Sequence, residues 1–177
     1  MSTDDEARSA ARLTVLSGPS GAGRGGVVEQ VRARLASVWV PVVATTRPPR
    51  PGERHGVDRL FLDPAGFDRL VDADGLLEWC RIGPYRRGVP RAGVRTRLAE
   101  GRPVLLPIDL AGALAVRAAV PQARLVLLAP PAYRADPVVA DAFAHAVTHD
   151  RTERAVAELV GLIGSSVLAP ARPPVSG

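Results

Sequence analysis

Two hydrophobic patterns alternate along the chain. Short apolar runs rich in β-branched residues are typical of buried strands, and such runs cover residues 13–17, 59–63, 76–82, 103–109 and 123–131. Segments whose apolar positions recur at helical spacing predict helices over residues 27–38, 64–75, 90–101, 111–120 and 152–166. Alternating strands and helices predict an α/β fold whose mostly parallel sheet is covered on both faces.

The remaining segments predict the domain boundaries. The polar residues 1–11 are expected to form a disordered leader, and the Pro-rich residues 167–177 a disordered tail, on either side of one folded domain over residues 12–166. Residues 38–56 form a second apolar run that ends in a loop rich in Pro and Arg, and residues 83–88 are expected to form a turn. Pro107 is unusual inside a predicted strand, because proline cannot donate a hydrogen bond to a neighbouring strand.

Composition restricts the class of protein. The chain has 177 residues, of which 46% are hydrophobic and 23% charged, as in an ordinary globular domain. No apolar run is long enough for a membrane span, and the polar start is not a secretory signal. Cys80 is the only cysteine, so no internal disulfide can form. We therefore expect a cytoplasmic protein with no membrane partner.

The net charge is +5, and all 23 basic residues are arginines. The sequence contains neither Lys nor Asn. Both missing residues have A-rich codons, which suggests a GC-rich genome. The 23 arginines are spread along the chain and are interleaved with few aromatic residues. Nucleic-acid-binding proteins instead gather their basic residues on one surface, so we do not expect a nucleic-acid partner.

A glycine-rich loop, "GPSGAGRG", follows the first predicted strand and precedes a predicted helix. This is the context of a phosphate-binding loop, whose backbone amides surround an anion at a helix N-terminus. The candidate residues are Gly18, Pro19, Ser20, Gly21, Ala22, Gly23, Arg24 and Gly25. Arg24 stands where this type of loop has Lys, and Gly25 lacks the hydroxyl that usually helps to hold Mg²⁺. The alternative is a glycine-rich turn with no ligand.

Seven segments resemble guanylate kinase, and they occur in the order found in that family. The most specific is "ATTRPPRPGERHGVD" at residues 44–58, and together the segments span roughly residues 12–164. The other six are "LTVLSGPSGAG", "GLLEW", "GVPR", "GRPVLLPIDLAGA", "LLAPP" and "TERAVAEL". The resemblance implies a P-loop NTPase-like three-layer core. It also implies a small inserted subdomain of the GMP-binding type over about residues 43–92, and ATP with Mg²⁺ as cofactors.

The resemblance also implies an acceptor site. Arg47 and Arg50 match arginines that bind the GMP phosphate, Glu78 matches a glutamate that accepts hydrogen bonds from guanine, and Asp109 matches a family aspartate. Five polar positions of the family are altered here: Val43, Arg59, Arg87, Pro107 and Val89. Arg87 is retained as an acceptor-binding candidate. The added arginines favour phosphate or carboxylate over a base, although each arginine could also be a solvated surface residue.

The resemblance implies that the lid is absent or vestigial. Family members carry a long helical segment after "LLAPP", with arginines that close over ATP. Here residues 132–140 leave room for about two helical turns, and Arg134 is the only basic residue among them. His149 corresponds to an adenine-contacting Asn of the family. The three histidines lack the spacing of metal ligands, so we predict no metal site built from protein side chains.

Three functions remain open at this point. The first is a guanylate-kinase-like protein that is catalytically impaired, with Arg24 as its one doubtful catalytic residue, and that binds a GMP-like nucleotide or another phosphorylated or acidic ligand. The second is an active nucleoside monophosphate kinase, whose acceptor is GMP or an altered nucleotide. The third is an interaction module that binds a protein partner in the former GMP cleft. The short lid, Arg24 and Gly25 favour the impaired protein. Phosphoryl transfer depends on positioning and charge neutralisation, and each of these three features weakens one of them.

Overall fold

The structure is a computed structural model that describes residues 12–168. The predicted leader over residues 1–11 lies outside the described residues, as does the predicted tail from residue 169 onward. The final helix, α7 (Thr152–Leu168), extends two residues into the segment predicted as tail. No helix within residues 12–168 is long and apolar enough to cross a bilayer.

The main lobe is built on a parallel sheet, as the hydrophobic pattern predicts. Its strands are β1 (Leu13–Ser17), β6 (Val104–Pro107), β7 (Arg124–Ala129) and β8 (His145–Thr148), in the order β6-β1-β7-β8. Every neighbouring pair in this sheet is parallel. In a parallel sheet the carboxyl ends of all strands lie at one edge, where ligands commonly bind.

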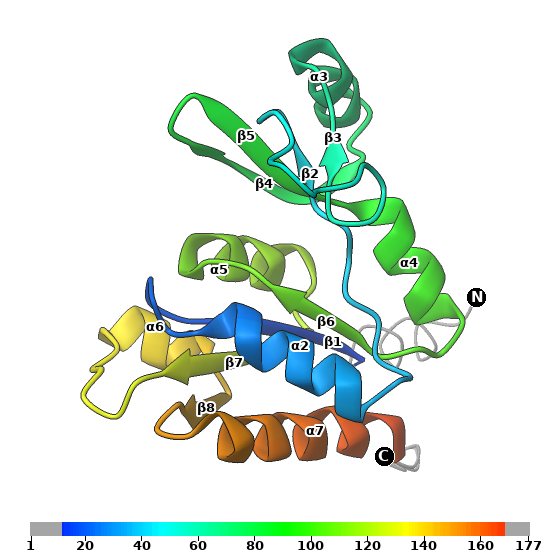
Figure 1. The fold of residues 1–177 in the computed structure, drawn as a ribbon. Helices are drawn as coiled ribbons and strands as arrows, with labels where there is room; N and C mark the ends of the chain where they lie inside the picture. The colour runs from blue at the N-terminus through cyan, green and yellow to red at the C-terminus, as the bar shows by residue number, and fades with distance from the viewer. Residues whose placement is uncertain (1–11, 169–177) are drawn as a thin grey trace, which may run out of the picture.

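Helices cover both faces of this sheet (Figure 1). On one face α2 (Arg24–Arg34) packs beside α7, and their buried side chains form one core cluster with Leu16, Leu105 and Leu128 of the strands. On the other face α5 (Leu110–Ala119) and α6 (Pro137–Ala142) contribute to a second cluster with Val15, Leu106 and others. These layers confirm the predicted three-layer α/β core.

A second lobe stands over the main sheet (Figure 1). It contains a mixed sheet of β2 (Ala44–Thr45), β3 (Leu60–Phe61), β4 (Leu76–Ile82) and β5 (Tyr85–Pro90), in the order β3-β2-β5-β4, together with α3 (Pro64–Asp72). A small core of Ala44, Phe67 and Leu76 holds it together. Helix α4 (Arg91–Ala99) and the segment that follows α2 connect it to the main lobe.

The structure corrects several predicted boundaries. The predicted turn over residues 83–88 is wrong beyond residue 84, because β5 starts at Tyr85 and pairs along β4. Strand β8 was not predicted at all. Helix α2 starts and ends earlier than the predicted 27–38, and the other predicted helices and strands differ by a few residues at their ends. Pro107 is the last residue of the edge strand β6, where a missing donor is tolerated.

Candidate functional site: a phosphate loop and an acceptor cleft

The glycine-rich loop connects β1 to α2 at the carboxyl edge of the main sheet. Gly21 and Gly23 have φ angles of 80° and 77°, which residues with a side chain rarely adopt. A Cβ on Gly18 would lie 2.0 Å from the carbonyl oxygen of Leu128. The loop therefore needs glycine at positions 18, 21 and 23, and its amides lead directly into the N-terminus of α2, where an anion is stabilised.

Arg24 is the first residue of α2, and its guanidinium bends back toward the loop. Its Nη1 donates a hydrogen bond to the carbonyl oxygen of Gly18. Burial lowers the pKa of Arg24, Asp109 opposes this shift and Arg87 adds to it. The positive charge of Arg24 therefore interacts electrostatically with Asp109 and Arg87, two of the predicted acceptor residues. Gly25 is exposed, and no atom would lie within 4 Å of a Cβ there.

His149 packs against the loop at Ala22 and Gly23. Its Nδ1 lies 2.7 Å from the carbonyl oxygen of Ala22, and because a carbonyl can only accept, Nδ1 is the donor. Its Nε2 lies 3.1 Å from the hydroxyl of Thr152. The ring is so close that a Cβ on Gly23 would lie 2.6 Å from it. His149 therefore supports the loop from the end of β8, a role that the family correspondence did not suggest.

The two predicted phosphate-binding arginines share one loop in the second lobe. Arg47 makes a two-pronged pair with Glu53, at 2.6 and 2.7 Å, and the Arg50 amide donates to the same carboxylate at 2.8 Å. The hydrogen bond from Arg47 lowers the pKa of Glu53 to about 2. The Arg50 guanidinium makes no hydrogen bond or ion pair with residues 12–168. Glu53 thus organises the loop and leaves one arginine free.

The register between β4 and β5 places four side chains on one face. Glu78 pairs with Val89 and Cys80 pairs with Arg87 across the two strands. Residues two apart in a strand point to the same side, so these four side chains form a patch. The patch faces α5, because a Cβ on Gly112 of that helix would lie 3.1 Å from Oε2 of Glu78. Strand alternation would have predicted Cys80 as part of this patch.

Glu78 is a buried carboxylate without hydrogen-bond donors. Its side chain is 1% exposed, and neither oxygen accepts a hydrogen bond from any residue between 12 and 168. Burial raises the pKa of Glu78, and Arg87 opposes this shift while Asp109 adds to it. A buried acceptor that lacks donors is costly, and in native proteins such a group commonly marks a functional site.

Arg87 joins Glu78 to the main lobe. Its Nη2 lies 3.8 Å from Oε1 of Glu78 and donates to Oδ2 of Asp109 at 3.1 Å. Its Nε donates to the sulfur of Cys80 at 3.4 Å. Asp109 is in turn the N-cap of α5, where its other oxygen accepts from the Gly112 amide at 2.8 Å. The predicted acceptor residues Glu78, Arg87 and Asp109 therefore lie together.

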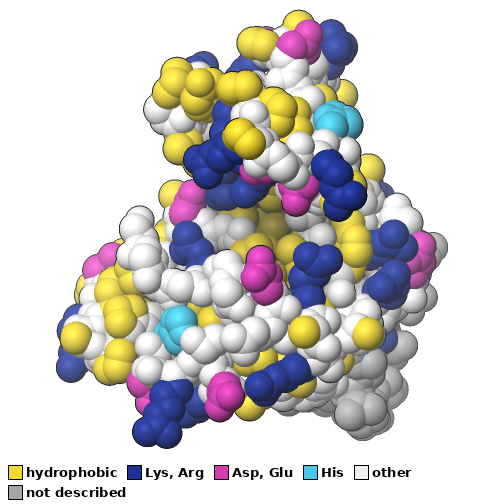
Figure 2. All heavy atoms as spheres, viewed as in Figure 1, with side chains coloured by type: hydrophobic (Ala, Val, Ile, Leu, Met, Phe, Trp, Pro, Cys, Tyr) yellow, Lys and Arg dark blue, Asp and Glu magenta, His cyan; other side chains and the backbone are white. Residues whose placement is uncertain are grey.

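Four of the five altered acceptor positions line one cavity of about 430 Å³ between the lobes. These are Val43, Arg59, Arg87 and Pro107. Figure 2 shows the molecule hollowed between its lobes, with arginine side chains gathered around the hollow. Burial lowers the pKa of Arg59, and the neighbouring charge of Arg47 adds to this shift. The fifth altered position, Val89, is buried opposite Glu78.

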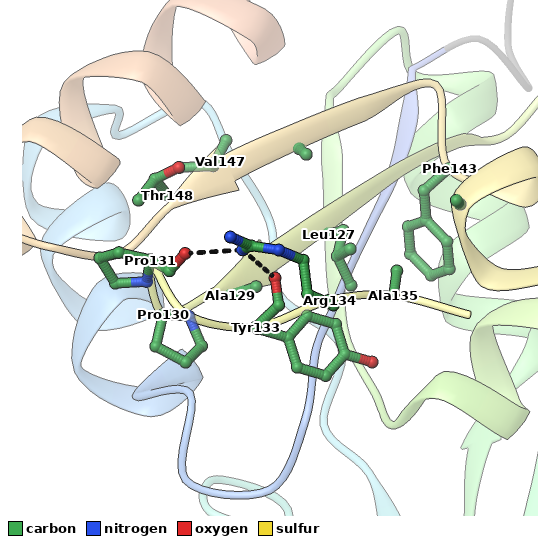
Figure 3. Close-up of a pocket in the computed structure, with 12 residues that line it drawn as sticks. Leu127, Ala129, Pro130, Pro131, Tyr133, Arg134, Ala135, Phe143, Val147 and Thr148 are labelled. Carbon is green, nitrogen blue, oxygen red and sulfur yellow. Dashed lines mark hydrogen bonds between the residues drawn. The ribbon is translucent and has the colours of Figure 1, made fainter. Parts of the chain in front are cut away.

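The segment after β7 is short, as predicted. The chain passes from Pro130 to the six-residue helix α6, and a cavity of about 330 Å³ lies next to β7 and β8 (Figure 3). Arg134 folds onto its own segment, where Nη1 donates to the carbonyl oxygens of Pro131 and Tyr133 at 3.1 and 3.2 Å. No helical lid covers the phosphate loop within residues 12–168. Among the same residues no three His, Cys, Asp or Glu side chains cluster as metal ligands would.

Comparison with known proteins agrees with this architecture. Residues 10–158 match the family model described as guanylate kinase. The chain is 57% identical over 122 residues to a guanylate kinase of Thermobifida fusca, which covers 69% of this chain and 62% of that relative. It is 52% identical over 122 residues to a guanylate kinase of Streptomyces coelicolor, with the same coverage. The chain thus spans less than two thirds of the length of these relatives.

Two further matches extend over most of the chain. A guanylate kinase of Mycolicibacterium paratuberculosis is 40% identical over 193 aligned positions, covering 94% of this chain and 86% of the relative. Because that alignment is longer than the 177-residue chain, the relative has residues that this chain lacks. The crystal structure of guanylate kinase from Anaplasma phagocytophilum shares the fold, with a TM-score of 0.71 at 22% identity over 89% of this chain and 86% of that one. This chain belongs to the guanylate kinase family.

Proposed function

We propose that this chain binds GMP in the cleft between its lobes and catalyses phosphoryl transfer to it from ATP. The observation that carries the proposal is Glu78, a buried carboxylate whose two oxygens accept no hydrogen bond from the part of the chain that the structure describes. Guanine offers two adjacent donors, the ring N1–H and the exocyclic amino group, which match the two oxygens of one carboxylate. Binding guanine would therefore satisfy a group that is costly in the free protein.

The remaining residues suit the rest of the two substrates. Arg47 and Arg50, whose guanidinium has no partner among residues 12–168, would hold the acceptor phosphate. The amides of the loop between β1 and α2 suit the phosphates of ATP, and Mg²⁺ supplies charge neutralisation when it is bound with the nucleotide. Gly25 offers no hydroxyl to that ion, so water or nucleotide oxygens would have to complete its coordination.

The names of the relatives support an active kinase more than an impaired one, since each of those compared above is called a guanylate kinase. Nothing in those names points to a protein-interaction module. We therefore favour an active kinase over a catalytically impaired protein.

A second candidate is a protein that binds guanine nucleotides but transfers phosphoryl groups slowly. Two observations favour it. Arg24 donates to the Gly18 carbonyl oxygen, and Arg134 donates to carbonyl oxygens of its own segment, so both guanidinium groups are partly used within the protein. Removing one electrostatic group of this kind often lowers turnover by a factor of about 10²–10³.

A coupled assay of ADP release with ATP, GMP and Mg²⁺ separates the two candidates. An active kinase gives GMP-dependent turnover that Arg47→Ala and Glu78→Gln each reduce. The Glu158→Gln variant is a matched control, since that carboxylate is exposed on α7 and does not line the cavity between the lobes. GMP binding without turnover would support the second candidate, and no binding of GMP by calorimetry would contradict both.

A further inference from the structure

The face of β4 and β5 that holds Glu78 carries a second group suited to a nucleobase. Arg87 is held by two contacts, from Nε to Cys80 at 3.4 Å and from Nη2 to Asp109 at 3.1 Å. Its side chain is 16% exposed and lines the cavity between the lobes. These contacts fix the direction of a planar guanidinium before any ligand arrives, which lowers the cost of using it in recognition.

Arg87 still has donors to spare. A guanidinium carries five N–H groups, and the two on Nη1 make no hydrogen bond with any residue between 12 and 168. The neighbouring Val89 carries no polar group, so Arg87 supplies the only cation on this four-residue face. Arg87 lines the cavity, and the buried Glu78 carboxylate lies directly behind it, with Oε1 at 3.8 Å from Nη2 of Arg87. A ligand that extends from the cavity onto this face would meet both groups.

Guanine presents complementary groups in the same order. The amino group, N1–H and the O6 acceptor lie in a row along one edge, and Arg side chains commonly donate to guanine O6 and N7. We propose that Arg87 is a specificity-determining residue that donates to guanine O6, while Glu78 accepts from the adjacent N–H groups. This inference rests on the proposed binding of GMP in the cleft.

The arrangement would also exclude adenine. At the position of O6 adenine carries an amino donor, which would face the donors of Arg87, and its unprotonated N1 would face the carboxylate of Glu78. Both contacts would be repulsive, and a site built around specific hydrogen bonds rejects ligands that cannot make them. Arg87 would thus supply polar recognition on a strand where Val89 supplies none.

Calorimetric titration with GMP, 6-thio-GMP and IMP tests the role of Arg87. Sulfur is a weak acceptor, so 6-thio-GMP reports the contact at position 6, whereas IMP lacks the amino group and reports Glu78. Wild-type protein is expected to bind GMP more tightly than 6-thio-GMP. Arg87→Met is expected to weaken GMP binding about 10- to 100-fold and to bring the GMP to 6-thio-GMP ratio close to one, as for a lost charge-assisted bond. The GMP to IMP ratio should not change.

The controls separate recognition from a structural role. Arg81→Met removes an exposed arginine from the same hairpin and should leave all three affinities unchanged. Equal weakening of GMP, 6-thio-GMP and IMP by Arg87→Met would overturn the inference, because it would mean that Arg87 only holds Glu78 and Asp109 in place. If Arg87→Met does not fold, equal affinity of wild-type protein for GMP and 6-thio-GMP overturns it as well.

The same titrations distinguish failure of the proposed function from failure of the inference about Arg87. If wild-type protein binds none of the three nucleotides, the proposed function fails. If it binds GMP and Glu78→Gln weakens that binding, but the GMP to 6-thio-GMP ratio does not depend on Arg87, only the inference about Arg87 fails.

Discussion

At the scale of single residues, neighbours decide what a charge can do. Glu53 and Glu78 are both glutamates within 4 Å of an arginine, but hydrogen bonds from Arg47 and the Arg50 amide hold the pKa of Glu53 at about 2. Glu78 has no such hydrogen bonds, and burial raises its pKa. The first carboxylate is committed to the structure of its loop, and the second remains available to a ligand.

Binding of GMP is expected to weaken as the pH is lowered from 8. Because the pKa of Glu78 is raised, protonation begins closer to neutrality than for an ordinary glutamate, and a protonated carboxyl no longer offers two acceptors. The phosphate of GMP itself changes charge with a second pKa of about 6, so affinity is compared between wild type and Glu78→Gln at each pH. The wild-type advantage should shrink with falling pH, and a constant ratio would contradict the prediction.

The same substitution should stabilise the ligand-free protein. In the folded state the raised pKa means that Glu78 holds its proton more tightly than in the unfolded chain, so its charge costs stability as the pH rises through that range. Glu78→Gln removes the buried charge. We expect its melting temperature at pH 8 to rise by roughly 2–4 °C, about 1 kcal/mol for a chain of this size. A lower melting temperature would show that Glu78 is structural.

Arg47 and Arg50, the two predicted phosphate-binding arginines, should behave differently when each is replaced by Ala. Arg50→Ala removes a free guanidinium, so GMP binding should fall about 10-fold or more with no change in thermal stability. Arg47→Ala also breaks the pair with Glu53, so both GMP binding and the protection of the Arg50 amide from hydrogen exchange should fall. Equal effects of the two variants on amide exchange would contradict this distinction.

At the scale of elements, the phosphate loop is shaped by what lies against it. Gly18 contacts the backbone of β7, Gly23 contacts the ring of His149, and Gly25 faces open space. The sequence pattern predicted the strand, loop and helix in order, but not which glycines are required. Contact with β7 and β8, which are distant in the chain, decides that.

Glycine substitutions in the loop test this distinction. Gly18→Ala places a Cβ 2.0 Å from a backbone oxygen, which cannot move without shifting β7, so a large loss of thermal stability is expected. The Cβ of Gly25→Ser would meet no atom within 4 Å, so this variant should leave stability nearly unchanged.

The loop can also be tested for activity. In the coupled assay, Arg24→Lys combined with Gly25→Ser should raise turnover about 10-fold or more, because it restores a compact cation and a hydroxyl for Mg²⁺. Unchanged turnover would mean that the loop does not limit the reaction.

At the scale of the whole molecule, the two lobes meet at the candidate site. Glu78 and Arg87 come from the upper sheet, and Asp109 and Arg24 come from the main lobe. Only one hydrogen bond within this group, from Arg87 to Asp109, joins the lobes. A nucleotide between the lobes would add contacts to both of them. Ligand binding should therefore change the relative position of the two lobes more than it changes either lobe.

Ligand stabilisation can be measured by thermal shift. A GMP concentration 100 times its dissociation constant stabilises the folded state by about 2.7 kcal/mol, which corresponds to a rise of roughly 5–10 °C for a chain of this size. AMP at the same concentration should give a much smaller shift, because its base mismatches Glu78. Equal shifts from GMP, AMP and inorganic phosphate would indicate an anion site without base recognition.

Sequence alone determined the α/β class, the strand–loop–helix order and the family resemblance, because hydrophobic period and glycine position are local signals. It predicted that Arg47 and Arg50 share a loop, and it marked Glu78, Arg87 and Asp109 as candidates. Only the tertiary structure decided that Glu78 is buried without donors, that Arg87 stands beside it, and that four altered positions line one cavity. Those properties depend on strand register and on packing between lobes, and both join residues that are far apart along the chain.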